Sequence, residues 1–224
     1  GEQHDPLPIL FQNDSGGRTV VVVHHNSPLR HQCLFPVIIR HLQAAFPKIS
    51  LDAGKGTGIL HQLPSADRLK PASNAQTFYF TNITPQLRNF NQRIWASFES
   101  RVREWAASSD TMYVVTGCTL DNSIGTAYDN NGRAVTVPGA YFKALLWYNS
   151  HSTYGSRYVA AGFYLEHRNY SQTALTQDMY MSIDELEELT GIDFFVNLPD
   201  KVGASTAAGI EAQDPADYGG LWGL

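Results

Sequence analysis

The chain has 224 residues, of which 43% are hydrophobic and 17% charged. This length and composition suit one sizeable core, so we predict a single domain over residues 1–224. The two cysteines, Cys33 and Cys118, are too few for a disulfide framework and lack the spacing of a zinc site; whether they pair stays open. No stretch approaches the run of about 20 apolar residues that a membrane-spanning helix needs.

Charge is distributed unevenly along the chain. The formal net charge is -5, yet residues 18–103 carry eleven Lys or Arg against three Asp or Glu, while residues 104–224 carry five against fifteen. A basic region suits a polyanion such as nucleic acid, because each phosphate contact draws on Lys or Arg. The alternative is that folding mixes the two regions and forms no basic face, and the charge count alone does not separate these readings.

Strands are predicted wherever β-branched and aromatic residues cluster, which is at residues 18–23, 34–39, 76–82, 112–117, 140–148 and 157–166. An Asn-Gly turn signal lies at residues 129–132. The strands and helices interleave without a βαβ rhythm. We therefore predict an α+β fold with a central mixed or antiparallel sheet and flanking helices.

Two helices stand out. From Pro85 to about Trp105, apolar residues recur at spacings of three and four, which predicts a helix with one buried stripe. A shorter helix is predicted after Ser182, because Ser182 and Glu185 have the spacing of a capping box, and this helix ends at Gly191.

A run of amide side chains lies where the predicted strand at residues 76–82 gives way to the long helix. Asn82 and Asn89 suit turn and cap positions. Asn91 follows the start of the helical pattern, four residues before Trp95, where Asn has poor helix propensity and adds no packing. Its amide oxygen suits a hard cation such as Mg²⁺, which keeps most of its waters and needs few protein ligands.

The neighbours of Asn91 extend this pattern. Glu99 and Arg103 lie further along the same predicted helix, and His61 precedes Asn91 by thirty residues. Glu99 and Arg103 also have the spacing of an ordinary helix ion pair, worth about 0.2–0.5 kcal/mol, which alone accounts for them if nothing else is present. Rival acid–base or metal-binding candidates are His24, His25 and His167.

Taken in order, these residues resemble the DNA/RNA non-specific endonucleases of the ββα-metal type. The resemblance covers roughly residues 61–200 and includes "NQRIW" around Asn91, "QTFYFTNITPQ" (76–86), "YVVTG" (113–117), "VPGAYFK" (137–143) and "SIDELEELTGIDFFVNLPD" (182–200). It implies an α+β fold in which a β hairpin and a helix hold one divalent cation, Mg²⁺ or another such as Mn²⁺. It also implies hydrolysis of phosphodiester bonds in DNA and RNA.

The resemblance implies a role for each candidate residue. His61 would be the general base that deprotonates the attacking water, and Asn91 would be the direct protein ligand of the metal. Glu99 would orient a water in the second shell of the metal, and Arg103 would bind the scissile phosphate. The basic count adds three predicted substrate-binding residues, Arg88, Arg93 and Arg101.

The segment before His61 departs from the family pattern. Where the family has Asp-Arg-Gly, this chain has Gly58, Ile59 and Leu60, and residues 1–60 resemble the family only faintly. The further upstream arginine that binds phosphate in the family is not placed, although Arg30 and Arg40 are two guesses.

Two hypotheses follow. The first is an exported, Mg²⁺-dependent endonuclease, secreted or periplasmic, and we interpret the start at Gly1 as the trimmed end of such a protein. The second is a catalytically weakened relative that binds nucleic acid or another polyanion. The set of His61, Asn91 and Glu99 favours the enzyme, whereas the missing Asp-Arg-Gly favours the binder. The oligomeric state is not predicted.

Overall fold

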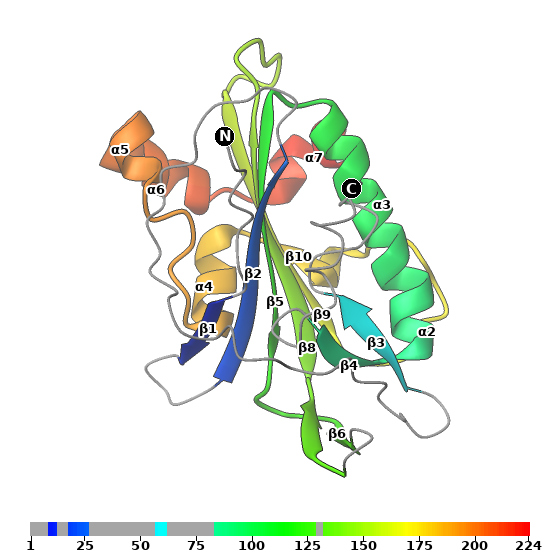
Figure 1. The fold of residues 1–224 in the computed structure, drawn as a ribbon. Helices are drawn as coiled ribbons and strands as arrows, with labels where there is room; N and C mark the ends of the chain where they lie inside the picture. The colour runs from blue at the N-terminus through cyan, green and yellow to red at the C-terminus, as the bar shows by residue number, and fades with distance from the viewer. Residues whose placement is uncertain (1–8, 13–17, 27–56, 62–82, 129–131) are drawn as a thin grey trace, which may run out of the picture.

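The computed structural model describes residues 9–12, 18–26, 57–61, 83–128 and 132–224, the first three segments as backbone only. At its centre is a six-stranded sheet in the order β1-β2-β5-β8-β9-β10 (Figure 1). All five neighbouring pairs are antiparallel, so the sheet is antiparallel rather than mixed. The strands are β1 (Ile9–Gln12), β2 (Arg18–Asn26), β5 (Thr111–Thr119), β8 (Ala140–Tyr148), β9 (Tyr158–Glu166) and β10 (Tyr180–Met181).

Helices cover both faces of this sheet, which explains why the middle strands are almost entirely buried (Figure 1). Tyr141, Leu145 and Trp147 of β8 belong to the core under the long helix α3 (Ala96–Ala107). Alternate residues of β8 belong to a second core under α4 (Ile183–Thr190) and α6 (Ala204–Glu211). The remaining short helices are η4 (Gln177–Met179), α5 (Leu198–Val202), η5 (Pro215–Tyr218) and α7 (Gly219–Trp222).

Two hairpins lie outside the main sheet. One joins β6 (Gly125–Tyr128) to β7 (Ala134–Val137). The other pairs β3 (Thr57–His61) with β4 (Ile83–Leu87), and β4 leads directly into α2 (Arg88–Phe90) and η3 (Asn91–Trp95), which continue into α3. None of the helices in the described part of the chain has the length and apolar content needed to span a bilayer.

The predicted strands that lie within the described residues are present in the main sheet. The strands predicted at residues 18–23, 112–117, 140–148 and 157–166 are confirmed as β2, β5, β8 and β9. The predicted capping box is also confirmed, since Ser182 and Glu185 exchange both hydrogen bonds, and Gly191 ends the helix in the left-handed conformation with φ of 66°. The strands predicted at 34–39 and 76–82, and most of the turn at 129–132, lie outside the described residues.

The predicted start of the long helix is wrong. Pro85 lies in β4, opposite Ile59 of β3, and the helix begins only at Arg88. A proline has no backbone N–H to donate, and it is tolerated in an edge strand because the outer edge has no neighbouring strand that needs this hydrogen bond.

The junction of β4 and α2 is fixed to the main sheet by side-chain hydrogen bonds. The Tyr141 hydroxyl of β8 donates to the Pro85 carbonyl at 2.9 Å. The backbone N–H of Leu87 donates to His167 Nε2 at 2.8 Å. The Asn89 side-chain oxygen accepts from the backbone N–H of Tyr170 at 3.0 Å, so Asn89 has a structural role, as expected, although through a distant residue and not as a cap.

His167 is therefore a structural histidine and not the rival catalytic candidate that its sequence context allowed. It is 2% exposed, and its Nδ1 lies 2.7 Å from the Pro138 carbonyl. Since Nε2 accepts a hydrogen bond from Leu87, the proton of the neutral ring is on Nδ1, which donates to Pro138. Burial lowers the pKa of His167 below its usual 6.5 because it disfavours the imidazolium.

We expect His167 to make the folded protein less stable in mild acid. Below pH 6.5 the unfolded chain takes up a proton that the folded chain does not, so the free energy of unfolding falls by up to about 1.4 kcal/mol per pH unit until the lowered pKa is reached. Urea unfolding between pH 5 and 8 measures this effect.

A His167→Gln variant is the control, since it cannot titrate. Comparison with this variant is needed because burial raises the pKa of Glu187 to about 7, which acts in the opposite direction over the same range. Parallel pH profiles for the two proteins would show that folding does not lower the pKa of His167, which would contradict its burial as a neutral acceptor from Leu87.

Candidate active site

The helix that carries the candidate residues contains one π turn. Residues Asn91–Trp95 are π-helical, and the N–H of Ala96 is shared between the carbonyl of Asn91, five residues back, and that of Arg93. Such a turn accommodates one residue more than an α-helical turn and often marks a functional site. The helical period of the sequence did not predict it, since that pattern assumes a regular helix.

The π turn decides which way Asn91 faces. In a regular helix, at about 100° per residue, Asn91 would lie about 20° from Phe98, inside the buried stripe. One additional residue rotates everything before it by about 100°, so in projection Asn91 falls between Glu99 and Arg103. Asn91 is half-buried, whereas Phe98 is 1% exposed, which agrees with this rotation.

The same rotation brings Phe90 into the core. Phe90 and Trp95 are both fully buried, and their rings stack with centroids 5.7 Å apart and planes at 26°. Residues five apart on a regular helix do not face each other, whereas residues three or four apart do. The stack of Phe90 on Trp95 therefore depends on the additional residue in the turn.

The face shared by Asn91, Glu99 and Arg103 offers oxygen ligands and one cation. Arg103 Nη2 lies 3.9 Å from Glu99 Oε2, and the two side chains are 37% and 15% exposed. Arg103 also donates to the Ser100 hydroxyl at 3.3 Å. The ion pair expected from the sequence is thus present, but it is long, and Glu99 is well shielded.

These groups fit a hydrated hard cation. Across the described residues, no group of three or more His, Cys, Asp or Glu side chains is arranged to hold a metal ion. An amide oxygen of Asn91 with the Glu99 carboxylate on the same face suits a cation such as Mg²⁺, which keeps several waters and needs few protein ligands.

His61 is the last residue of β3, where it lies opposite Ile83 of β4. Strand β3 packs beside α2, which puts the hairpin next to the start of the site helix. Gly58, Ile59 and Leu60, which replace the Asp-Arg-Gly of the family, are also in β3.

The arginines predicted to bind substrate lie in different surroundings. Arg88 and Arg93 are exposed, and Arg93 donates to the Ser171 carbonyl at 2.7 Å. Arg101 is two positions before Arg103, which on a helix means about 160° around the axis. The structure thus brings Arg103 together with Asn91 and Glu99, and it places Arg101 on another side.

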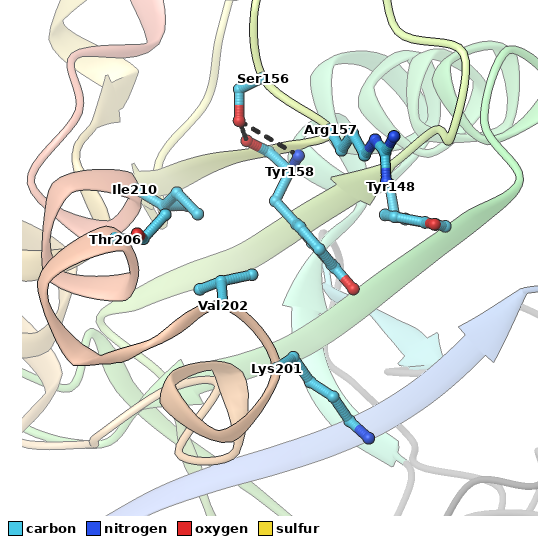
Figure 2. A pocket seen from close by; sticks show the side chains of 8 residues that line it. All are labelled: Tyr148, Ser156, Arg157, Tyr158, Lys201, Val202, Thr206 and Ile210. Atoms are coloured by element: carbon cyan, nitrogen blue, oxygen red, sulfur yellow. Dashed lines mark hydrogen bonds between the residues drawn. The ribbon is translucent and has the colours of Figure 1, made fainter.

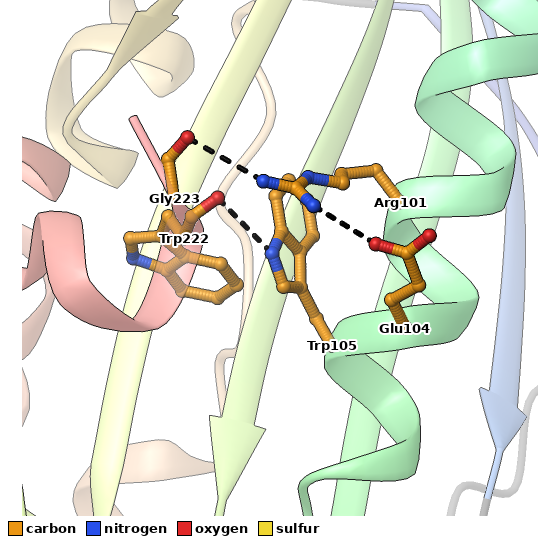
Figure 3. A network of polar contacts seen from close by, with 5 residues as sticks. All are labelled: Arg101, Glu104, Trp105, Trp222 and Gly223. Atoms are coloured by element: carbon orange, nitrogen blue, oxygen red, sulfur yellow. Dashed lines mark hydrogen bonds and ion pairs between the residues drawn. The ribbon is translucent and has the colours of Figure 1, made fainter.

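Arg101 contacts the C-terminal segment (Figure 3). Its guanidinium lies 2.9 Å from the Glu104 carboxylate, 3.5 Å from the Gly223 carbonyl and 6.0 Å from the centre of the Trp105 ring. The Trp105 indole also donates to the Trp222 carbonyl at 3.1 Å. These contacts join α3 to α7 and compete with any phosphate for the Arg101 guanidinium.

Gln86 is a polar residue to which the sequence pattern assigned no role. It is 0% exposed in β4, and neither of its amide atoms has a hydrogen-bond partner within the described part of the chain. A buried amide without partners costs about 1–3 kcal/mol, which is unusual in a native strand. A glutamine in the short run "ITPQL" is the sequence signal that could have drawn attention to it.

A pocket of about 350 Å³ lies elsewhere, between the paired ends of β8 and β9 and the helices α5 and α6 (Figure 2). It is lined by Tyr148, Ser156, Arg157, Tyr158, Lys201, Val202, Thr206 and Ile210. No candidate site residue lines this pocket, so it is separate from the face of Asn91, Glu99 and Arg103.

A hairpin that leads into a helix bearing an amide, a carboxylate and an arginine on one face is the arrangement typical of the ββα nuclease fold. The chain belongs to the DNA/RNA non-specific endonuclease family, whose model matches residues 61–201. The resemblance found in the sequence is thereby confirmed.

Individual relatives agree with this assignment. The chain is 31% identical to a nuclease of Serratia marcescens over 147 residues, which are 65% of this chain and 53% of the relative. It is 30% identical to a nuclease of Nostoc sp. over 172 residues, 72% of this chain and 59% of the relative. The chain therefore spans little more than half the length of these curated relatives.

The fold is also found in a solved structure. A chain from the crystal structure of the EndoG/EndoGI complex matches with a TM-score of 0.57 at 16% identity, over 87% of this chain and 86% of that one. At this identity the match shows the shared fold alone, and it confirms the predicted α+β class.

The π turn leads to a test by deletion. Gln92 is exposed within the turn, so removing it should convert the π turn into an α turn while leaving Asn91 and Phe90 facing as they do now. We expect the deletion variant to fold and to cleave plasmid DNA in Mg²⁺ within a few-fold of the parent.

Insertion of one alanine after Gln92 is the matched control. It should rotate Asn91 by about a further 100° and lower the cleavage rate by about 10²-fold, a typical cost of a misplaced group. Loss of cleavage in a folded deletion variant, together with normal cleavage in the insertion variant, would contradict the orientation assigned to Asn91.

Arg88 and Arg101 should differ in their effects on substrate binding. Replacement of exposed Arg88 by Ala should reduce the slope of log affinity against log salt by about 0.9 on duplex DNA, the loss of one phosphate contact. Arg101→Ala should mainly lower thermal stability, because its contacts hold the C-terminal segment. Salt titrations of DNA binding and thermal melts measure the two effects. Equal slope changes would show that Arg101 leaves Gly223 to bind phosphate, as its basic neighbourhood in the sequence predicted.

Proposed function

We propose that the protein is a Mg²⁺-dependent endonuclease that hydrolyses phosphodiester bonds in both DNA and RNA. The observation that best supports this is the π turn, which turns Asn91 onto the face of Glu99 and Arg103, next to the hairpin that ends in His61. Membership of the DNA/RNA non-specific endonuclease family supports the same reaction class. Mn²⁺ or another divalent cation of similar preference would serve in place of Mg²⁺.

Each residue has a proposed role. His61 takes a proton from the attacking water, a task for which an imidazole that titrates near neutrality is suited. Asn91 would hold the cation, and the cation would supply positive charge to the phosphate and to the leaving oxygen. Glu99 would orient a water beside the cation by accepting a hydrogen bond from it. Arg103 binds the scissile phosphate as negative charge builds on it.

The substrate contacts proposed around this site are to the phosphate backbone. Arg88 and Arg93 supply positive charge at the start of the site helix, and phosphate contacts carry no base identity. Arg101, the third arginine predicted from the sequence, is held by Glu104 and Gly223 on another side of the helix and would bind phosphate only if it left them. We therefore propose that the protein accepts DNA and RNA with little sequence preference. We further propose that residues 1–224 form one domain of an exported protein, secreted or periplasmic.

A second candidate is a catalytically weakened member of the family that binds nucleic acid or another polyanion. The replacement of Asp-Arg-Gly by Gly58, Ile59 and Leu60 directly before His61 favours it. This replacement removes an acid and a phosphate-binding arginine from the strand that carries the general base.

Substitutions of His61 and Asn91 separate the two candidates. His61→Ala should lower the cleavage rate by about 10²–10⁴-fold while binding to nucleic acid persists. Asn91→Ala should lower the rate and weaken the dependence on Mg²⁺ together. Cleavage of plasmid and of RNA, each with Mg²⁺ or with EDTA, measures both effects.

Asn89→Ala is the control for loss of an amide two residues away. It removes the hydrogen bond to Tyr170, so we expect a loss of about 1 kcal/mol in stability and normal cleavage. An inactive parent protein that still binds nucleic acid would support the weakened binder. Activity lost in folded Asn89→Ala but kept in Asn91→Ala would show that the metal ligand has been assigned to the wrong amide.

A further inference from the structure

Lys143 ends the motif "VPGAYFK" and is not among the residues to which the proposed reaction gives a role. It is 1% exposed, in the middle of β8, opposite Thr116 of β5 and Phe163 of β9. Its Nζ donates a hydrogen bond to the Thr116 hydroxyl at 2.8 Å. Removing an ammonium group from water is costly, so a buried lysine needs specific partners and is rarely present only to fill space.

Two of those partners belong to the site helix. The Lys143 Nζ lies 4.9 Å from the centre of the Trp95 ring and 5.9 Å from that of Phe98. Attraction between a cation and the face of an aromatic ring is strongest for tryptophan, and it increases when both groups are shielded from water. The contact with Trp95 therefore ties β8 to the last residue of the π turn.

Trp95 is the residue on which the turn closes. Its ring stacks on Phe90, which precedes the turn, and meets Phe98, which follows it, edge to face at 5.7 Å. Its ring centre also lies 5.4 Å from that of Tyr141 on β8. If the turn relaxed to a regular α turn, the segment before it would rotate by about 100°, and Phe90 would lose this stack.

We propose that Lys143 is a positioning residue: its buried ammonium holds the Trp95 ring where the π turn is required, and so keeps Asn91 on the face of Glu99 and Arg103. The effect on the turn is independent of the reaction. The effect on cleavage rests on the proposed function, because it operates through Asn91 as the metal ligand.

The primary test measures the turn itself without metal or substrate. Lys143→Met keeps most of the length of the side chain and removes its charge. In this variant the amide of Ala96 should exchange with solvent at least about tenfold faster, because its bonds to the carbonyls of Asn91 and Arg93 open more often. The amide of Leu145 in β8 is the internal reference. Lys201→Met, which removes an exposed charge from α5, is the matched variant and should leave Ala96 unchanged.

A suppressor experiment separates positioning from general support of the core. When Gln92 is deleted, the turn becomes a regular α turn, which does not need the contact of Lys143 with Trp95 to stabilise it. Lys143→Met should lower the cleavage rate about tenfold or more in the chain that keeps Gln92 but have little effect in the deletion variant. If the single variant Lys143→Met fails to fold, the double variant that also lacks Gln92 should fold.

The outcomes are distinct for the two proposals. Unchanged exchange at Ala96 in Lys143→Met, or equal damage with and without Gln92, would overturn the positioning role of Lys143. Faster exchange at Ala96 with normal cleavage would keep the positioning role and contradict its predicted effect on cleavage, and Asn91→Ala then tests the metal ligand separately.

Discussion

The stack of Phe90 on Trp95 is the contact on which the geometry of the site depends. It joins the residue before the π turn to the last residue within it, and it is present only because the turn contains one residue more than an α turn. With Phe90 packed inward, Asn91 is turned away from the core and toward Glu99. A hydrophobic contact thus sets the direction of a polar side chain.

Residues of the main sheet and of the segment that follows it pack against the stack of Phe90 on Trp95. Tyr141 of β8 packs on both Phe90 and Trp95 and donates to the Pro85 carbonyl. His167 packs edge-on against Phe90 and accepts from Leu87. Each of these residues makes an aromatic contact and a hydrogen bond to the backbone, so the start of the site helix is fixed in both position and rotation. The ββα unit is therefore anchored to the main sheet. Such support is needed where the side chains of a site must keep fixed positions relative to one another.

Features that depend on local sequence could be predicted. Strands β5, β8 and β9 are long β-branched and aromatic runs, and the capping box of Ser182 and Glu185 is a signal within four residues. The candidate residues Asn91, Glu99 and Arg103 could be found because their order along the chain resembles that of a known family. The geometry of the helix, with its π turn, groups these three residues on one face, as the resemblance to the family implies.

Features that depend on distant contacts could not be predicted. A period of 3.6 residues assumes a regular helix, whereas the π turn ends at Trp95, whose ring packs against β8, some fifty residues further along the chain. The contacts of Arg101 are with Gly223, so a count of charges along residues 18–103 could not place its side chain. The hydrogen bond from Leu87 to His167 likewise crosses eighty residues, and only the fold shows that this histidine is structural.

A crystal structure with Mn²⁺ in place of Mg²⁺ would test most directly whether the π turn presents Asn91 to the metal. Anomalous scattering locates the ion without reference to the protein atoms. We predict one ion bonded to the Asn91 side-chain oxygen at about 2.0–2.3 Å, with Glu99 reached through a water and residues 91–95 in the π conformation. An ion bound away from Asn91, or a regular α turn at these residues with Asn91 facing the core, would contradict the claim that the π turn presents Asn91 to the metal.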